Sequence, residues 1–238
     1  MPKRTQPKHA RPAPAGLSRE VIIGTALAQI DTIGPQALSM RSLAQQLGVE
    51  AMSLYRYVNG REDLLEGVVA RLMGNLNANL DPTLTEHWQG FLQAVAHEVR
   101  SIAIAHPRAF PLVATRHPAA PWLRPPLRSV EVVDTFLSAL IGYGFTDEQA
   151  VGAYRSFTSL LLGHLLLESA VRGADTGPAS EPLDEGGAVI PEHDGQKDLA
   201  NAPEVVRLRP LLSEERSDEE FDISLEALLD RLNLRLTQ

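Results

Sequence analysis

The sequence predicts an all-α protein, and two features of the chain support this fold class. Apolar residues recur at three- and four-residue steps in successive segments, and these segments end at glycine or proline, as amphipathic helices do. No stretch alternates apolar and polar residues in the manner of a half-buried strand. A length of 238 residues with a hydrophobic share of 44% provides for one large or two small domains with a sizeable core.

Composition excludes several classes of site. The chain has no cysteine, so disulfides, thiolate zinc sites and cysteine nucleophiles are all excluded. No window holds eighteen uninterrupted apolar residues, and the first residues lack the apolar core of a signal sequence. We therefore expect a soluble, cytoplasmic protein that makes no membrane contact.

The charge of the chain is divided unevenly. The formal net charge is −8, but the residues through Arg61 carry +5 and the remainder carries −13. Such asymmetry favours a basic, DNA-binding beginning on an acidic body. A basic segment that only improves solubility is the alternative.

Residues 17–63 are predicted to form a compact unit of three helices. The first helix spans 18–33 and ends at a Gly-Pro pair, and the second starts at Ser39, whose hydroxyl can cap free amides. A turn containing Gly48 leads to a third helix that starts near Ala51. This arrangement is typical of a helix-turn-helix, although spacing alone leaves an ordinary antiparallel helix pair possible.

The remaining residues, 64–238, are predicted to form a larger helical domain. Residues 173–203 hold five glycines, four prolines and seven acidic residues, which predicts a flexible acidic loop. Residues 1–16 are predicted to be a disordered basic arm, either contacting DNA or serving as a tail without specific contacts. The expected helices after the first three span 62–80, 84–105, 108–115, 127–142, 147–172 and 217–236.

Several stretches of the chain carry a family resemblance. In the first domain they are AL at 26–27, the glycine at 34, LSMRSLAQQLGV at 38–49, SLYRYV at 53–58 and REDLL at 61–65. In the second they are VATR at 113–116, GYGFTDEQA at 142–150 and the G-x-x-L-x-E ending at 163–168. These stretches resemble the tetracycline-repressor (TetR) family of dimeric bacterial transcription regulators. The resemblance implies a DNA-binding regulator whose residues 64–238 bind an effector and form the dimer.

The resemblance also implies which side chains contact operator DNA. Arg41 would address a base edge, while Tyr55 and Arg61 would hold phosphates. On the residues alone, Tyr55 could instead be core and Arg56 merely solvated. Met40 and the Ala51-Met52 pair depart from the tetracycline repressor, which predicts a different operator. The expected DNA-binding residues are Ser39, Met40, Arg41, Ala51, Met52, Ser53, Tyr55, Arg56, Tyr57 and Arg61.

The body is expected to bind a small-molecule effector that is largely apolar. Where tetracycline repressors carry a magnesium-binding histidine, this chain has Leu112, and its own histidines lack ligand spacing, so neither a metal nor another cofactor is expected. Core packing is the stronger interpretation for any single aromatic residue of the body. The candidate pocket residues are Trp88, Phe91, Phe110, Arg116, Trp122, Arg155, Phe157 and His164.

Three functions are weighed against one another. The first is a homodimeric repressor that an effector releases from a palindromic operator, with helices 147–172 and 217–236 forming a four-helix bundle between subunits. The second is an enzyme, which the lack of a phosphate loop or a Ser/His/Asp motif disfavours. The third is a DNA-binding activator or structural regulator that responds to no effector. The sequence favours the repressor.

Overall fold

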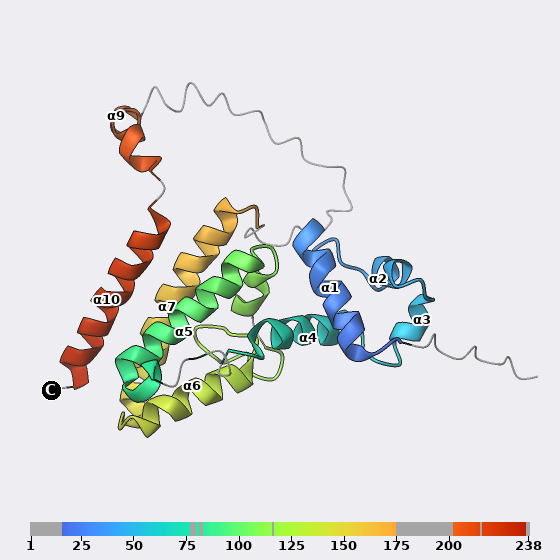
Figure 1. Ribbon diagram of the computed structural model, residues 1–238, viewed down its shortest axis with the longest axis horizontal. Coiled ribbons are helices and arrows are strands. Elements are labelled where there is room, and N and C mark those ends of the chain that lie inside the picture. Colours follow the sequence, from blue (N-terminus) through green and yellow to red (C-terminus); the bar gives the residue numbers. More distant parts are fainter. Residues whose placement is uncertain are drawn as a thin grey trace, which may run out of the picture. The chain divides into compact units, whose positions relative to one another are not determined.

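The computed structural model is helical in every regular element that it describes, which confirms the predicted fold class. Its described residues are 16–76, 80, 83–115, 117–174, 202–214 and 216–236. The described helices fall into two compact units (Figure 1). The first holds α1 (Arg19–Ile33), α2 (Met40–Gln46), α3 (Ala51–Leu54), α4 (Arg61–Met73), η1 (Leu84–Glu86), α5 (Trp88–Ala105), η2 (Phe110–Ala114), α6 (Val130–Gly142) and α7 (Asp147–Val171). The second holds α9 (Pro203–Leu212) and α10 (Ser217–Leu236).

Helices α1 to α3 and the first part of α4 surround a small apolar core, and we call this group the head. Its five largest fully buried side chains come from all four helices, which fixes the three predicted helices around one centre. They are Ile22, Ile30, Leu43, Leu54 and Leu64. The sequence therefore predicted both the helices and the core of the head, although a domain boundary after residue 63 stays a prediction.

Helix α4 packs closely on α1 because it carries a glycine at the contact. A Cβ atom added to Gly67 would lie 2.5 Å from the Cδ1 atom of Ile23, so a larger side chain would force the two helices apart. From this contact α4 runs away from the head and towards α5, α6 and α7 (Figure 1). One helix thus belongs to the head at its start and to the body at its end.

The body of the first unit is built around α5, α6 and α7. Aromatic rings from these helices meet in its core: Phe136 of α6 stacks on Phe157 of α7 at 5.3 Å between centroids and lies 6.0 Å from Phe91 of α5. At the start of α5, three residues before Phe91, Trp88 meets Phe145 edge-on. The long apolar helix predicted over 147–172 is therefore a central helix of the body. No helix in the described ranges combines the length and the apolar character needed to cross a membrane.

The segment expected over 108–115 is the 3-10 helix η2, and three α-helices begin or end three or more residues from the predicted position. Helix α4 ends at Met73 rather than 80, because Gly74 and Asn75 are poor helix formers and the chain turns there. Helix α5 begins at Trp88 rather than 84, since His87 is extended and interrupts the preceding 3-10 turn. Helix α6 begins at Val130 because Ser129 caps it, accepting a hydrogen bond from the Val132 amide.

The second unit contains one predicted helix and one unpredicted helix. Helix α10 has the predicted bounds, and its buried side chains form a single row: Phe221, Leu225, Leu229 and Leu232. Helix α9 was missed, because Pro210 inside it argues locally against a helix. The predicted basic arm and almost all of the predicted acidic loop lie outside the described residues.

Polar contacts join the head to the body at the far end of α1. The Nδ1 atom of His106, just after α5, lies 2.8 Å from a carboxylate oxygen of Asp31. Arg108 donates to the carbonyl oxygens of Asp31 and Thr32. Beside this contact an open groove of about 610 Å³ separates parts of α1, α4 and α5. These polar contacts and α4, which continues from one into the other, join the head to the body.

Candidate nucleic-acid interface and effector cavity

The turn between α2 and α3 is built as the sequence predicted. Ser39 caps α2 reciprocally with Ser42: the hydroxyl of each side chain accepts a hydrogen bond from the backbone amide of the other residue. Gly48 has φ of 67°, which L side chains rarely adopt, and so lets the chain reverse direction. The Val49 amide then donates to the Ala44 carbonyl at 2.9 Å, which closes the turn. These local bonds fix α3 against α2.

Helix α3 has one buried side and one exposed side. Leu54 is fully buried in the head core, whereas Met52 is 74% exposed and Tyr55 is 49% exposed. A large apolar side chain with three quarters of its surface in water gains nothing from that position in the free protein. The exposed side of α3 is therefore available for a partner.

The ten expected DNA-binding residues do not all have the same surroundings. Tyr55 is not part of the core, which removes that alternative, and Arg41 and Arg56 are exposed. Met40, Ala51, Ser53 and Tyr57 are half-buried, and Ser39 is exposed while its hydroxyl serves as the α2 cap.

Arg61 has a structural function that the sequence did not predict. Its guanidinium donates to the carbonyl oxygen of Pro35 at 2.9 Å and to that of Leu38 at 3.4 Å. These bonds tie the start of α4 to the turn before α2. The donors that would bind a phosphate are thus partly engaged within the head.

A second arginine ties the head together. Arg19 donates to both carboxylate oxygens of Asp63, at 2.6 and 3.1 Å, and to the carbonyl oxygen of Tyr57 at 3.0 Å. These bonds lower the pKa of Asp63 below its usual value of 3.8; partial burial opposes this shift and the Asn59 amide adds to it. Sequence spacing does not reveal this pair, since Arg19 and Asp63 lie 44 residues apart.

Replacing Asp63 with asparagine is expected to destabilise the protein at neutral pH by about 1 kcal/mol, the upper range for a partly exposed pair. Because the folded pKa is depressed, the pair's contribution is present above pH 3.8 and is lost as the pH falls through the folded value. Urea unfolding curves at neutral pH and in strong acid measure the difference. A difference between the two proteins that does not shrink in acid would contradict the assignment.

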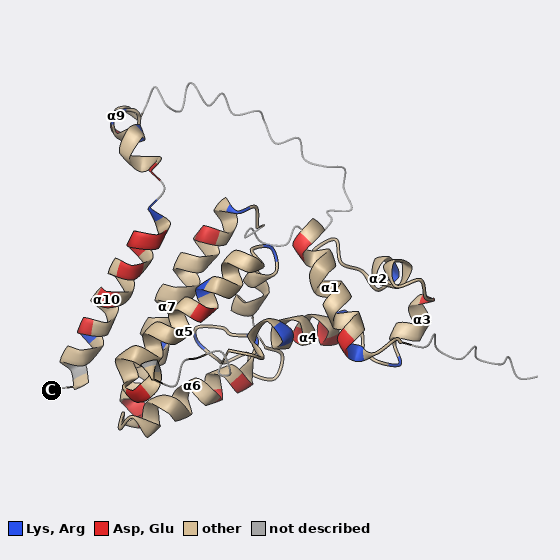
Figure 2. Ribbon diagram, in the orientation of Figure 1, with Lys and Arg blue, Asp and Glu red and all other residues tan. Residues whose placement is uncertain are grey.

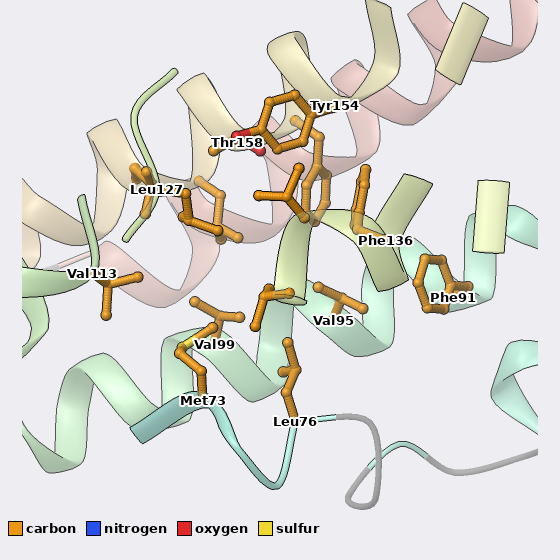
Figure 3. A pocket seen from close by; sticks show the side chains of 15 residues that line it. Met73, Leu76, Phe91, Val95, Val99, Val113, Leu127, Phe136, Tyr154 and Thr158 are labelled. Carbon is orange, nitrogen blue, oxygen red and sulfur yellow. The ribbon is translucent and has the colours of Figure 1, made fainter. Parts of the chain in front are cut away.

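The body contains an apolar cavity of about 50 Å³ between α5, α6 and α7 (Figure 3). Met73 and Leu76, at the end of α4, lie on the side opposite Tyr154 and Thr158. None of the lining residues is charged: they are Met73, Leu76, Phe91, Val95, Val99, Val113, Leu127, Val132, Val133, Phe136, Tyr154, Phe157, Thr158, Leu161 and Leu162.

The cavity has few polar groups. The Tyr154 hydroxyl donates to the Pro125 carbonyl at 3.0 Å, and burial raises the pKa of Tyr154 to about 12, so the phenol stays neutral. Thr158 is buried beside it on α7. A charged ligand would find no counter-charge in this lining, and its desolvation would be costly. The lining therefore suits a neutral, largely apolar molecule.

The structure brings two of the eight expected pocket residues to this cavity, Phe91 and Phe157. The others described do not line the cavity. Phe110 is fully buried but away from the cavity lining, Trp88 contacts Phe145, and His164 is half-buried. Trp122 is 74% exposed and Arg155 is exposed, so neither side chain lines the cavity. Arg116 lies outside the described residues.

Two ion pairs that involve buried arginines of the body could not be predicted from the sequence. Arg100 of α5 donates to both carboxylate oxygens of Glu168 on α7, at 3.0 and 2.9 Å. Arg128, before α6, donates to the Thr115 hydroxyl at 2.7 Å and to Glu62 of α4 at 3.3 Å. Among the described residues no group of three or more histidine, aspartate or glutamate side chains could hold a metal ion.

The charge asymmetry of the sequence depends on its first fifteen residues. In residues 16–61 the four arginines are nearly balanced by three carboxylates, and Figure 2 shows both signs on the head. The other four basic residues belong to the predicted arm. Contacts between this arm and DNA stay a prediction.

Comparisons with known proteins agree with this architecture. Residues 22–68 match the family described as "Bacterial regulatory proteins, tetR family", and residues 92–184 match "Tetracyclin repressor-like, C-terminal domain". The chain is 30% identical over 156 residues to the class E tetracycline repressor protein of Escherichia coli, which is 66% of this chain and 71% of that protein.

Two solved structures share the fold. A possible TetR family transcriptional regulator from Streptomyces coelicolor A3(2) superposes with a TM-score of 0.67 at 26% identity, covering 93% of this chain and all of that one. The Streptomyces coelicolor TetR family protein ActR in complex with actinorhodin superposes with a TM-score of 0.66 at 22% identity, covering 94% of this chain and 100% of that one.

Proteins of this family are regulators rather than enzymes; they bind operator DNA as dimers and bind small molecules. The predicted DNA-binding regulator controlled by an effector is thereby confirmed. The chain belongs to the tetR family of bacterial regulatory proteins.

Proposed function

We propose that this protein is a homodimeric repressor that leaves a palindromic operator when a neutral, largely apolar molecule occupies the cavity. The observation that carries the proposal is the position of α4: it begins in the head, and its last turn and the residues after it supply Met73 and Leu76 to the cavity wall. A change in the cavity is therefore expected to move α4, which continues into the DNA-binding head.

The small size of the cavity supports a coupled motion. Pockets for drug-sized ligands usually measure about 300–1,000 Å³, several times the present volume. Such a ligand must push the wall outward, and packed interiors respond by shifting whole elements rather than by compressing. Since α4 closes one side, its end is displaced when the ligand enters. The effector is thus proposed to act through α4.

The proposed DNA contacts are the ten residues expected from the sequence, with Arg41 and the exposed side of α3 as the main readers. Arg61 contributes chiefly by holding the turn before α2, since two backbone carbonyls already occupy its guanidinium. In a two-fold dimer the recognition helices must lie about 34–36 Å apart to enter successive major grooves. Small changes in the position of the heads are therefore enough to change this distance and weaken operator binding.

Dimerisation is proposed to involve apolar side chains that stay exposed in the single chain. On α7, Leu167 and Val171 are 73% and 83% exposed. On α10, Ile223 and Leu234 are also exposed. Each of these faces would be covered by a second copy of the chain. We place the dimer in the cytoplasm, where bacterial DNA is accessible.

The operator can be found by selecting bound fragments from random DNA with the full-length protein. A repressor of this type is expected to enrich one palindrome and to bind it more tightly than random DNA at every salt concentration. Enrichment of no sequence would contradict the proposal. An affinity for the palindrome that no compound in a broad panel changes would favour the effector-insensitive regulator.

A further inference from the structure

Arg128 connects the cavity wall to the first turn of α4. Its side chain is 8% exposed, and the guanidinium lies between two partners. The Nε atom donates to the Thr115 hydroxyl at 2.7 Å, and both terminal nitrogens lie within 3.4 Å of one carboxylate oxygen of Glu62. The buried guanidinium thus has the polar partners that it requires, Thr115 on the body and Glu62, whose side chain is 63% exposed, on α4.

The segments that hold Arg128 also line the cavity. Leu127, its neighbour in the chain, is a lining residue, and so is Val113. The Arg128 amide donates to the Val113 carbonyl at 3.0 Å, and the Thr115 hydroxyl donates to the Leu112 carbonyl at 2.7 Å. Backbone and side chain of Arg128 are therefore both fixed to one wall of the cavity.

The first turn of α4 is fixed equally well to the DNA-binding helices. Arg61 precedes Glu62, and its guanidinium bonds to the carbonyl oxygens of Pro35 and Leu38. Leu38 comes directly before the Ser39 cap of α2. The chain of contacts thus runs from the cavity wall through Arg128 and the start of α4 to the beginning of the helix-turn-helix.

We propose that the Arg128–Glu62 pair is the fixed point about which α4 turns when the cavity is occupied. This inference rests on the proposed function and specifies its mechanism. The ligand displaces the end of α4, at Met73 and Leu76, while Arg128 holds its start against the wall that Val113 and Leu127 form. Because one end moves and the other is held, the displacement becomes a rotation of the head. Without the pair, α4 slides along the body and the head turns less.

A double-mutant cycle on operator affinity tests this role without a known effector. The surrogate for a ligand is Val99→Phe, which adds bulk to the cavity from α5. Dissociation constants for the selected palindrome are measured for the wild type, Val99→Phe, Glu62→Ala and the double variant. Val99→Phe is expected to weaken binding by about five-fold or more in the wild-type background, the lower range for allosteric coupling. In the Glu62→Ala background the same substitution is expected to change binding by less than about two-fold.

Two controls separate coupling from charge and from stability. Glu20→Ala removes an exposed carboxylate from the first turn of α1, so it matches the change in head charge and should leave the Val99→Phe effect intact. Arg128→Lys keeps the positive charge but cannot bridge Thr115 and Glu62 as a planar guanidinium does, and should reproduce Glu62→Ala. Melting temperatures of all variants are recorded, and Thr158→Leu replaces Val99→Phe if the latter does not fold.

The outcomes are distinct. Equal effects of cavity filling with and without Glu62 would overturn the role of the pair, as would the absence of any effect in both backgrounds. Failure of the wild type to select any DNA sequence would instead refute the proposed function.

Discussion

Replacing Glu168 with alanine is expected to lower the free energy of unfolding by about 3–5 kcal/mol, the usual cost of breaking a buried ion pair from one side. Glu168 is 8% exposed and accepts hydrogen bonds from Arg100 and from Arg172, the latter at 3.1 Å. Its removal leaves the Arg100 guanidinium, 11% exposed, without its carboxylate between α5 and α7. Guanidinium chloride unfolding followed by circular dichroism at neutral pH measures the loss.

Arg172→Ala is the matched control for this ion pair. The Arg172 side chain is 41% exposed, so its contribution should stay below about 1 kcal/mol. Equal losses for Glu168→Ala and Arg172→Ala would contradict the assignment of the buried pair to Arg100.

Acid should remove the advantage that the wild type has over Glu168→Ala. Burial alone would raise the pKa of Glu168, but hydrogen bonds and positive charges of Arg100 and Arg172 outweigh burial and lower it. A depressed folded pKa means that the stabilisation is complete above the usual value of 4.5 and disappears as the pH falls through the folded value. The two unfolding curves should therefore converge in acid.

Replacing Arg41 with alanine is expected to weaken binding to the selected operator by about 1–3 kcal/mol, or roughly 5- to 150-fold, and to relax the preference at one base pair. Arg41 is exposed near the start of α2, and an arginine in a major groove binds guanine through two hydrogen bonds. Fluorescence anisotropy with the palindrome and its single-base variants measures both effects.

Arg155→Ala provides the control for Arg41, because Arg155 is an exposed arginine of α7 in the body. It removes the same charge without touching the head and should leave operator affinity unchanged within about two-fold. Arg41→Ala could instead weaken binding to every sequence alike and reduce the slope of log affinity against log salt concentration by about one. In that case Arg41 contacts a phosphate and not a base.

The sequence predicted the head well because its determinants are local. The Ser39 cap, the Gly48 turn and the spacing of Leu43, Leu54 and Val58 all act within a few residues of one another. Such signals are readable from spacing. The same holds for α7 and α10, whose predicted bounds differ from the observed ones by at most one residue.

The ion pairs were not predictable in the same way. Arg100 and Glu168 are 68 residues apart, and Arg128 and Glu62 are 66 residues apart, so no local pattern joins them. Residue type alone favoured Arg155 and Trp122 as pocket candidates, but both are exposed. Which arginine becomes buried depends on how helices pack, and that information is absent from the spacing of a single helix.

Filling the cavity is expected to lower the affinity of the protein for its operator, and a measurement that links ligand binding to operator affinity tests this most directly. Compounds that raise the melting temperature of the wild type are tested for their effect on operator affinity, with Val99→Phe as the variant whose cavity is already filled. A neutral, apolar compound that stabilises the wild type is expected to weaken its operator binding as well, and to have neither effect on Val99→Phe. Stabilising compounds that leave operator affinity unchanged, or that act equally on Val99→Phe, would contradict it.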